Sequence, residues 1–169
     1  SRAGNVSSSP DEGEKYQHMR PASAIILVGG STPSRIRSQF GMPVCLLPLP
    51  FSSSILTAWV ELLSGIESVR DITVVTGLPE DHECIERAVA EVRRTLRIEV
   101  RVTTDRKEHR GTAGTVRDVI SDLQMENDLL VVEGTTIPPL TDMGLAEWGL
   151  REEAPTGILA TDANSEPAG

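Results

Sequence analysis

The chain has few of the residues that mark secreted, membrane or nucleic-acid-binding proteins. Its 169 residues include only two cysteines, too few for a disulfide framework and typical of a reduced compartment. Lys and Arg number 16 against 25 Asp and Glu, so the chain lacks the basic surface that nucleic acids require. No apolar run approaches the ~20 residues of a membrane span, and the first residues lack a signal-peptide layout. We therefore expect a cytoplasmic protein that binds neither nucleic acid nor membrane.

The two ends of the chain are polar and the middle is apolar and periodic. Residues 1–21 are rich in Ser, Gly and charged side chains, which predicts a disordered tail, and residues 163–169 predict a flexible end. Between them lies one domain, over residues 22–162. A domain of that size buries roughly two-thirds of the surface that its unfolded chain exposes.

Short apolar, β-branched runs alternate with segments of helical period. We expect strands at 24–28, 72–76, 98–102, 129–132 and 158–160, and helices at 55–66, 85–96 and 112–123. Ser54 stands where a side chain caps the first of these helices, and Trp59 falls in its apolar stripe. The alternation predicts an α/β fold, a Rossmann-like three-layer α/β/α arrangement around a mostly parallel sheet.

A glycine loop follows the first predicted strand. Residues 24–28 lead directly into Gly29, Gly30 and Ser31, and the small-residue segment closes on Arg35. Two glycines at the end of a buried strand let the backbone turn sharply and present N–H groups to a phosphate. The same residues also suit an ordinary tight turn. The position of this loop in the fold distinguishes a phosphate-binding loop from an ordinary turn.

A second glycine motif opens the last predicted helix of the domain. Gly111, Thr112, Ala113 and Gly114 form its first turn, and a helix N-terminus attracts anions. Basic side chains crowd the preceding residues: Arg106, Lys107, His109 and Arg110. This basic cluster is either a phosphate contact or a solvated loop in an otherwise acidic chain.

Several common sites are excluded by spacing. The chain has no Gly-x-x-x-x-Gly-Lys-Ser/Thr, and no third spaced glycine follows Gly29 and Gly30, which disfavours ATPase and NAD-binding loops. The three histidines are scattered without zinc-ligand spacing, and no Ser–His–Asp set can be assembled. Metal hydrolases and triad enzymes are therefore disfavoured.

Taken in order, four segments carry a family likeness. They are the strand with its Gly-Gly loop, the run Met-Pro-Val-Cys-Leu-Leu-Pro-Leu from Met42, the Gly-Thr-Ala-Gly motif, and the strand that ends Glu133-Gly134. In this order and spacing, residues 22–140 resemble the sugar-phosphate nucleotidylyltransferases, which make nucleoside-diphosphate sugars from a nucleoside triphosphate and a sugar 1-phosphate. The Gly-Thr-Ala-Gly motif matches letter for letter.

The resemblance implies roles for the two glycine motifs. Amides of the first loop meet phosphates, the Gly-Thr-Ala-Gly motif meets the nucleoside, and Arg35 is the expected catalytic cation. Such enzymes work mainly by stabilising charge with Arg, Lys and Mg²⁺ held by Asp. A nucleoside triphosphate or nucleotide sugar is thus the expected ligand, with Mg²⁺ as cofactor if the chain is active.

The chain departs from the family pattern at charged positions. The first loop is one residue longer and contains Pro33, Val44 replaces the expected Lys, and Thr135 replaces the expected Asp. Losing one such charge costs about 3–4 kcal/mol of transition-state stabilisation. Glu133 lies two residues before Thr135, on the same face if both are in the strand, and is the candidate metal ligand at a position shifted by about 6–7 Å.

The departures leave three functions open. The first is a weak or inactive nucleotidyltransferase with a degenerate active site, and the second a non-catalytic regulatory or assembly homologue that binds nucleotide, as a homo-oligomer or with a regulatory partner. The third is an unrelated α/β domain for another phosphate ligand. In the family, the sugar pocket and a second metal Asp follow the fifth strand, where this chain has a short polar end, so we expect a truncated acceptor site.

Overall fold

Four parallel strands form the centre of the protein. The computed structural model describes residues 20–29, 35–106 and 111–139. The strands are β1 (Ala22–Leu27), β2 (Val69–Thr76), β3 (Glu99–Thr104) and β4 (Asp128–Glu133), in the order β3-β2-β1-β4. All neighbouring pairs are parallel, as the alternating pattern predicted. The predicted strand at 158–160, residues 1–19 of the predicted tail and the predicted flexible end lie outside the described residues.

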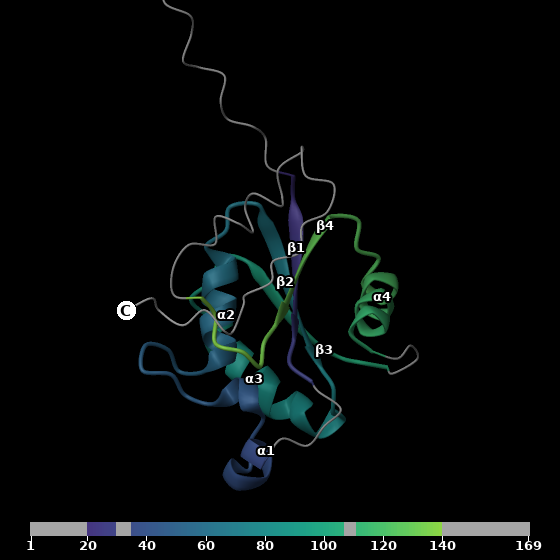
Figure 1. The fold of residues 1–169 in the computed structure, drawn as a ribbon. Coiled ribbons are helices and arrows are strands. Elements are labelled where there is room, and N and C mark those ends of the chain that lie inside the picture. Colours follow the sequence, from purple (N-terminus) through teal and green to yellow (C-terminus); the bar gives the residue numbers. More distant parts are fainter. Residues whose placement is uncertain (1–19, 30–34, 107–110, 140–169) are drawn as a thin grey trace, which may run out of the picture.

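Helices cover both faces of the sheet (Figure 1). Helices α2 (Ile55–Ser64) and α3 (His82–Arg93) lie on one face, and α4 (Gly111–Leu123) lies on the other. This confirms the Rossmann-like three-layer α/β/α fold. The sequence pattern did not predict the short helix α1 (Arg35–Phe40) or the 3-10 turns η1 (Val44–Leu46) and η2 (Pro79–Asp81). None of the helices in the described part of the chain has the length and apolarity needed to cross a bilayer.

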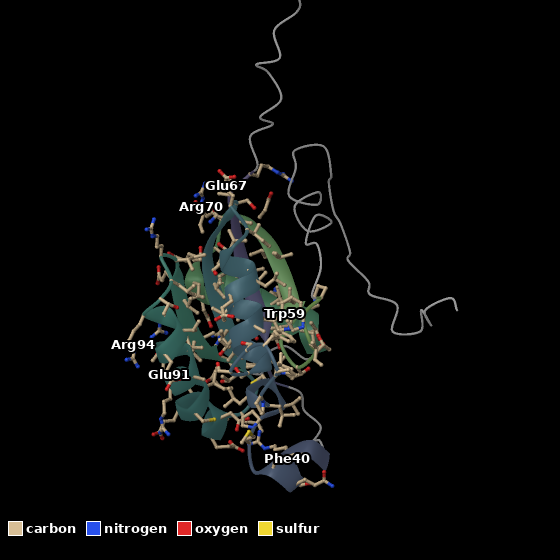
Figure 2. All side chains as sticks on the ribbon, turned by 90° about the vertical axis from the view of Figure 1, so that its left-hand side faces the viewer. Phe40, Trp59, Glu67, Arg70, Glu91 and Arg94 are labelled. Carbon is tan, nitrogen blue, oxygen red and sulfur yellow. The ribbon has the colours of Figure 1, made fainter. Side chains whose placement is uncertain are left out.

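Helix α2 begins where its cap was predicted. The Oγ atom of Ser54 accepts a hydrogen bond from the backbone N–H of Thr57 at 3.0 Å, which satisfies one of the free donors of the first turn. Helix α3 is amphipathic, and Figure 2 shows Glu91 and Arg94 extending from its outer side. Both side chains are exposed, as predicted for the charged face of this helix.

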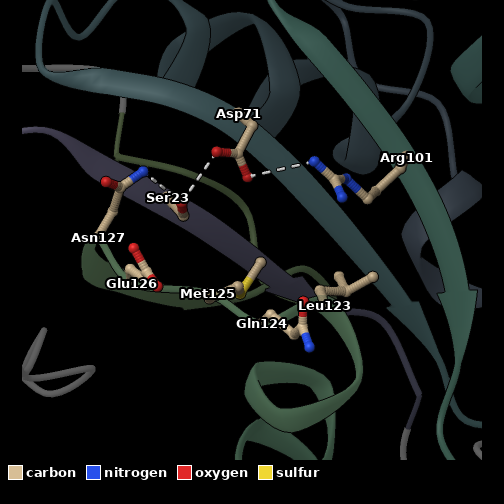
Figure 3. A pocket seen from close by; sticks show the side chains of 8 residues that line it. All are labelled: Ser23, Asp71, Arg101, Leu123, Gln124, Met125, Glu126 and Asn127. Atoms are coloured by element: carbon tan, nitrogen blue, oxygen red, sulfur yellow. Dashed lines mark hydrogen bonds and ion pairs between the residues drawn. The ribbon is translucent and has the colours of Figure 1, made fainter.

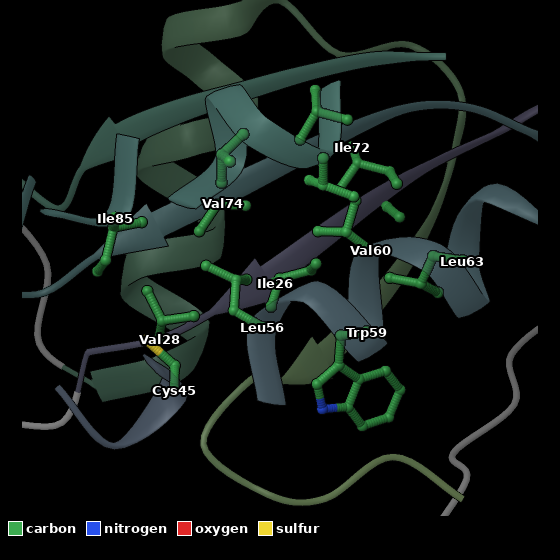
Figure 4. Close-up of a cluster of buried hydrophobic side chains, with 14 of the residues drawn as sticks. Ile26, Val28, Cys45, Leu56, Trp59, Val60, Leu63, Ile72, Val74 and Ile85 are labelled. Carbon is green, nitrogen blue, oxygen red and sulfur yellow. The ribbon is translucent and has the colours of Figure 1, made fainter. Parts of the chain in front are cut away.

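Most of the buried apolar side chains lie between the sheet and helices α2 and α3 (Figure 4). We call this cluster the main core. Its fully buried members include Ile26, Leu56, Val60, Leu63, Ile72, Val74 and Ile85. A smaller cluster under α4 contains Ile25, Val75 and Val119. The main core therefore holds β1, β2 and the two helices as one rigid support for the strand ends.

Candidate functional site

The carboxyl ends of β1 and β4 are neighbours, and the crossover helices that connect these two strands to the rest of the sheet lie on opposite faces. Strand β1 is followed by α2 on one face, whereas β4 is preceded by α4 on the other. Leu27 and Glu133 are paired in register at the ends of these strands. Open α/β sheets bind ligands at such a switch point, in the crevice outside the carboxyl ends of the strands. Gly134 follows Glu133 directly and Gly29 comes two residues after Leu27, so the two glycines flank this point.

Gly29 is held against the backbone of the chain that follows β2. A Cβ atom added to Gly29 would lie 2.1 Å from the backbone nitrogen of Gly77, and one added to Gly77 would lie 2.8 Å from the Cα of Gly29. Both distances are far inside van der Waals contact, so neither position accommodates a side chain. Backbone packing alone thus requires glycine at position 29. Gly30 and Ser31, the other predicted phosphate contacts of this loop, lie outside the described residues.

Helix α1 follows this loop and is tied to the start of α3. The predicted catalytic Arg35 is the first residue of α1, but its side chain is outside what the structure describes. Arg37 instead forms a bidentate ion pair with Asp81. Its Nη2 atom lies 2.6 Å from Oδ1 of Asp81, and its Nη1 atom contacts Oδ2. The hydrogen bonds that Arg37 donates to Asp81 raise the pKa of Arg37 above its ordinary value, so its charge is fixed. Sequence reasoning missed this pair, and no local pattern signals it.

The Gly-Thr-Ala-Gly motif opens α4 as predicted, and its four residues differ in exposure. Gly111 has a left-handed backbone with φ of +80°, and an added Cβ would meet no atom within 4 Å. Gly111, Thr112 and Ala113 are exposed, whereas Gly114 is buried. The hydroxyl of the next residue, Thr115, donates to Oδ2 of Asp105 at 2.8 Å. This bond fixes the first turn of α4 beside the end of β3, with three of the four motif residues accessible to a ligand.

The basic cluster before α4 is only partly described. The Nε atom of Arg106 lies 2.8 Å from Oδ2 of Asp122, which is in the last turn of α4. That ion pair therefore lies toward the far end of the helix from Gly111, and not at the first turn where the phosphate interpretation placed this residue. Lys107, His109 and Arg110 lie outside the described residues.

Glu133 ends β4 and is exposed, but its relation to Thr135 differs from the prediction. The chain turns at Gly134, whose N–H donates to the carbonyl of Leu27 at 2.8 Å. The Thr135 hydroxyl consequently donates to Oε1 of Glu133 at 3.0 Å. The predicted strand spacing does not apply to the two side chains, because β4 ends at Glu133, two residues before Thr135.

The donor set for a divalent cation at this edge is small. Within the described residues, no three His, Cys, Asp or Glu side chains converge as metal ligands. Mg²⁺ is commonly held by one or two carboxylates together with substrate phosphates and water. Glu133 alone fits that pattern when a phosphate-bearing ligand supplies the remaining oxygens, so Mg²⁺ stays an expectation tied to a bound nucleotide.

Val44, which replaces the expected Lys, has a packing role. It begins the 3-10 turn η1, is half-buried, and packs against the main core beside the buried Cys45. Burial raises the pKa of Cys45 to about 12, so this thiol stays neutral and unreactive. The position that the resemblance assigns to a phosphate-binding cation therefore contributes an apolar contact to the fold.

A polar cluster at the ends of β2 and β3 was not predicted. The hydroxyl of Thr76 donates to Oγ1 of Thr104 at 3.0 Å, and Nδ1 of His82 lies 3.2 Å from the same atom. Thr76 is fully buried and His82 is partly exposed. The available signal was a threonine at the end of each strand, which became informative only once β2 and β3 were paired.

The opposite edge of the sheet has a different polar pocket (Figure 3). It has a volume of about 260 Å³ and is lined by Ser23, Asp71 and Arg101 from the strands and by residues 123–127 from the α4–β4 connection. Ser23 donates to Asp71 at 2.9 Å and accepts from Asn127 at 3.2 Å, and Arg101 lies 3.9 Å from Asp71. These groups mostly satisfy one another. The pocket is at the amino ends of the strands, remote from the glycine motifs.

Comparison with known proteins adds a weak similarity to solved structures. No protein-family model matches the chain, and no curated protein matches it. Among solved structures, the chain is similar to 4-diphosphocytidyl-2C-methyl-D-erythritol synthase from Anaerococcus prevotii, with a TM-score of 0.46 and 13% identity. The match covers 70% of this chain and 44% of that chain, so the protein spans less than half of the synthase's length. The fold assignment itself follows from the parallel sheet and its two helix layers.

Proposed function

We propose that the protein binds a nucleoside triphosphate or a nucleotide sugar at the carboxyl edge of its sheet. The observation that carries this proposal is the switch point between β1 and β4, flanked by Gly29 and Gly134. The exposed residues Gly111, Thr112 and Ala113 open α4 at the same edge. Backbone N–H groups at a helix N-terminus and a strand–glycine turn are the elements that hold phosphates in α/β folds.

The four segments with nucleotidylyltransferase-like spacing support assignment to that type of domain. Transfer of a nucleotidyl group needs cations around the reacting phosphate. The packed Val44 supplies no charge, and the hydroxyl of Thr135 is directed to Glu133. We therefore expect binding with weak turnover or none. Arg35 and Glu133 are the residues that would support residual activity, with Mg²⁺ bound through Glu133 and the nucleotide phosphates.

The second candidate is a non-catalytic regulatory or assembly homologue that retains the nucleotide site. The packing of Val44 against the main core favours it, because this contact contributes to the fold without contributing to catalysis. A cytoplasmic location and either self-association or a regulatory partner belong to both candidates. The two differ in turnover and agree on nucleotide binding.

Nucleotide binding is tested by calorimetry with nucleoside triphosphates and nucleotide sugars, each with and without Mg²⁺. Ala113→Glu places a negative charge at the exposed first turn of α4, where it stabilises the helix but repels phosphate. We expect it to weaken binding at least tenfold. The matched control is Ser121→Glu, exposed near the last turn of the same helix, which is expected to leave affinity unchanged. Absence of binding by the unmodified protein would refute the proposal.

Turnover is measured as pyrophosphate release with a panel of sugar 1-phosphates. Binding without release selects the non-catalytic candidate, and release above background selects the transferase. Glu133→Ala should abolish the Mg²⁺ dependence of nucleotide affinity while leaving metal-free binding intact. Unchanged Mg²⁺ dependence in that variant would remove Glu133 from the site.

A further inference from the structure

One short segment contacts the chain on both sides of the glycine loop. The segment after β2 contacts Gly29, at the start of the loop, through Gly77. Four residues later it contacts Arg37, in the helix that follows the loop, through Asp81. Residues 30–34 connect these two anchored parts of the chain. We infer that the Arg37–Asp81 pair is a positioning pair, which fixes α1, and with it the backbone of Arg35, beside the strand ends where the proposed function places the phosphates; this inference rests on the proposed function.

The orientation of Asp81 is the first argument. Asp81 occupies the N-cap position of α3, where an aspartate side chain ordinarily accepts a hydrogen bond from its own helix. Here its side chain makes no capping bond, and both oxygens accept from Arg37. The Asp81 side chain is 11% exposed, so the carboxylate is directed away from water and toward α1. Both carboxylate oxygens of Asp81 therefore serve a contact between separate elements, α1 and the start of α3.

The length of α1 is the second argument. Its six residues are too few for a helix to be stable by itself, so tertiary contacts must hold it. The last residue of α1, Phe40, is 61% exposed, and Figure 2 shows α1 at the lower edge of the molecule. Two parallel N–H···O bonds from a guanidinium fix direction as well as distance. Arg37 is therefore suited to orient α1, and Arg35 is two residues away on the same helix.

The test separates phosphate binding from fold stability. Arg37→Met and Asp81→Asn each remove the pair, and affinities are measured for a nucleoside triphosphate and for the corresponding nucleoside, which lacks phosphates. We expect triphosphate affinity to fall about tenfold in both variants, since small displacements of anchoring groups have effects of at least this size. Nucleoside affinity should stay within twofold. Arg37→Lys keeps the charge but loses the bidentate geometry, so its triphosphate affinity should lie between those of the unmodified protein and of Arg37→Met.

The matched control is Arg87→Met. Arg87 forms a single ion pair with Glu83 on the exposed side of α3, 3.1 Å long, and joins no separate elements. It should change neither affinity. Hydrogen exchange of the amides of residues 37–41 should rise in Arg37→Met and Asp81→Asn and not in the control. If Arg37→Met does not fold, Arg37→Lys and Asp81→Asn carry the same comparison.

The outcomes distinguish this inference from the proposed function. Loss of triphosphate affinity with retained nucleoside affinity supports the positioning role. Equal loss of both affinities, or no loss in any of the variants, overturns it while leaving nucleotide binding in place. If the unmodified protein binds neither ligand, the proposed function fails, and the positioning role fails with it.

Discussion

The two faces of the sheet are built differently. The face under α2 and α3 is covered by a continuous apolar cluster that extends from Ile26 at the centre to Ile85 and Val100 beside α3. The face under α4 has a smaller apolar cluster, in which Ile25 of β1 and Val75 of β2 pack with Val119. Beside β2 and β3 it carries polar side chains, among them Asp71 and Arg101. Stability therefore resides mainly on one face.

The difference shows that the strand ends are supported mainly from one side of the sheet. The strand ends of the proposed site are held from the α2 and α3 side, where Trp59 also donates its Nε1–H to the carbonyl of Thr136 at 2.7 Å. That bond fixes the turn after Glu133 to helix α2. Since the main core supports the edge independently of the residues exposed there, we expect substitutions of those exposed residues to leave the fold intact.

The largest expected effect is a truncation in the main core. Leu56→Ala, at a side chain only 1% exposed, should lower the free energy of unfolding by about 3–4 kcal/mol because the cavity cannot fully collapse. Leu123→Ala, at the half-buried end of α4, should cost about 1–2 kcal/mol. Urea unfolding followed by circular dichroism measures both. Equal losses would show that the two faces contribute alike.

The next effect is an alkaline loss of stability that comes from the main core. Burial raises the pKa of Cys45 from 9.0 to about 12, so the folded state keeps the thiol neutral while the unfolded chain ionises. The stabilisation is complete below pH 9 and is lost between pH 9 and 12, at about 1.4 kcal/mol per pH unit. Denaturation from pH 8 to 11 should give a steeper decline for the unmodified protein than for Cys45→Ala. Parallel pH profiles would contradict this origin.

A smaller effect is expected on the polar part of the α4 face. Ser23 is buried and bridges Asp71 and Asn127, so Ser23→Ala should cost about 1–2 kcal/mol through two lost hydrogen bonds. Ser64→Ala, whose hydroxyl is exposed and bonds only within α2, should change stability by less than about 0.5 kcal/mol. Thermal unfolding compares the pair. If Ser23→Ala leaves the melting temperature unchanged, water replaces the two hydrogen bonds of the Ser23 hydroxyl at no cost in stability.

The smallest expected effect is a gain at the end of α4. Gln124 has a left-handed backbone with φ of +50°, just after the last helical residue, and the N–H of Met125 closes the helix on Ile120. Glycine adopts this conformation without strain, so Gln124→Gly should stabilise by about 0.5–1 kcal/mol. Ser121→Gly, inside the helix, should destabilise by a similar amount. The two melting temperatures should shift in opposite directions.

Local pattern predicted the fold well. Apolar periodicity placed the strands and the three long helices of the described chain within a few residues, and it predicted both the Ser54 cap and the packing of Trp59. These features depend on neighbours in sequence, which a pattern records directly. The relation of Thr135 to Glu133 was not predictable in this way, because the turn at Gly134 depends on its bond to Leu27, more than a hundred residues earlier.

The site was less predictable, because its decisive contacts join distant residues. Arg37 and Asp81 are 44 residues apart, and nothing in either local sequence indicates the other. The contact between Gly29 and Gly77 becomes visible only when β1 and β2 are paired. The exposed start of α4 was predictable because helix-opening glycines are a local signal. The roles of the predicted ligand contacts at Gly29, at Gly111 through Gly114, at Arg35 and at Glu133 stay predictions.

The Gly29–Gly77 contact also determines what natural variation at this edge can reveal. The backbones of Gly29 and Gly77 are in contact, and no second substitution can compensate for a larger residue at either position, because glycine is already the smallest residue. Both positions should therefore stay glycine in relatives with or without a ligand, and their invariance would carry no information about binding. Gly111 is different, because its surroundings are open and only its backbone conformation favours glycine. An asparagine there would be tolerated by the fold, so a glycine retained at 111 would be the more informative record of selection for a bound molecule.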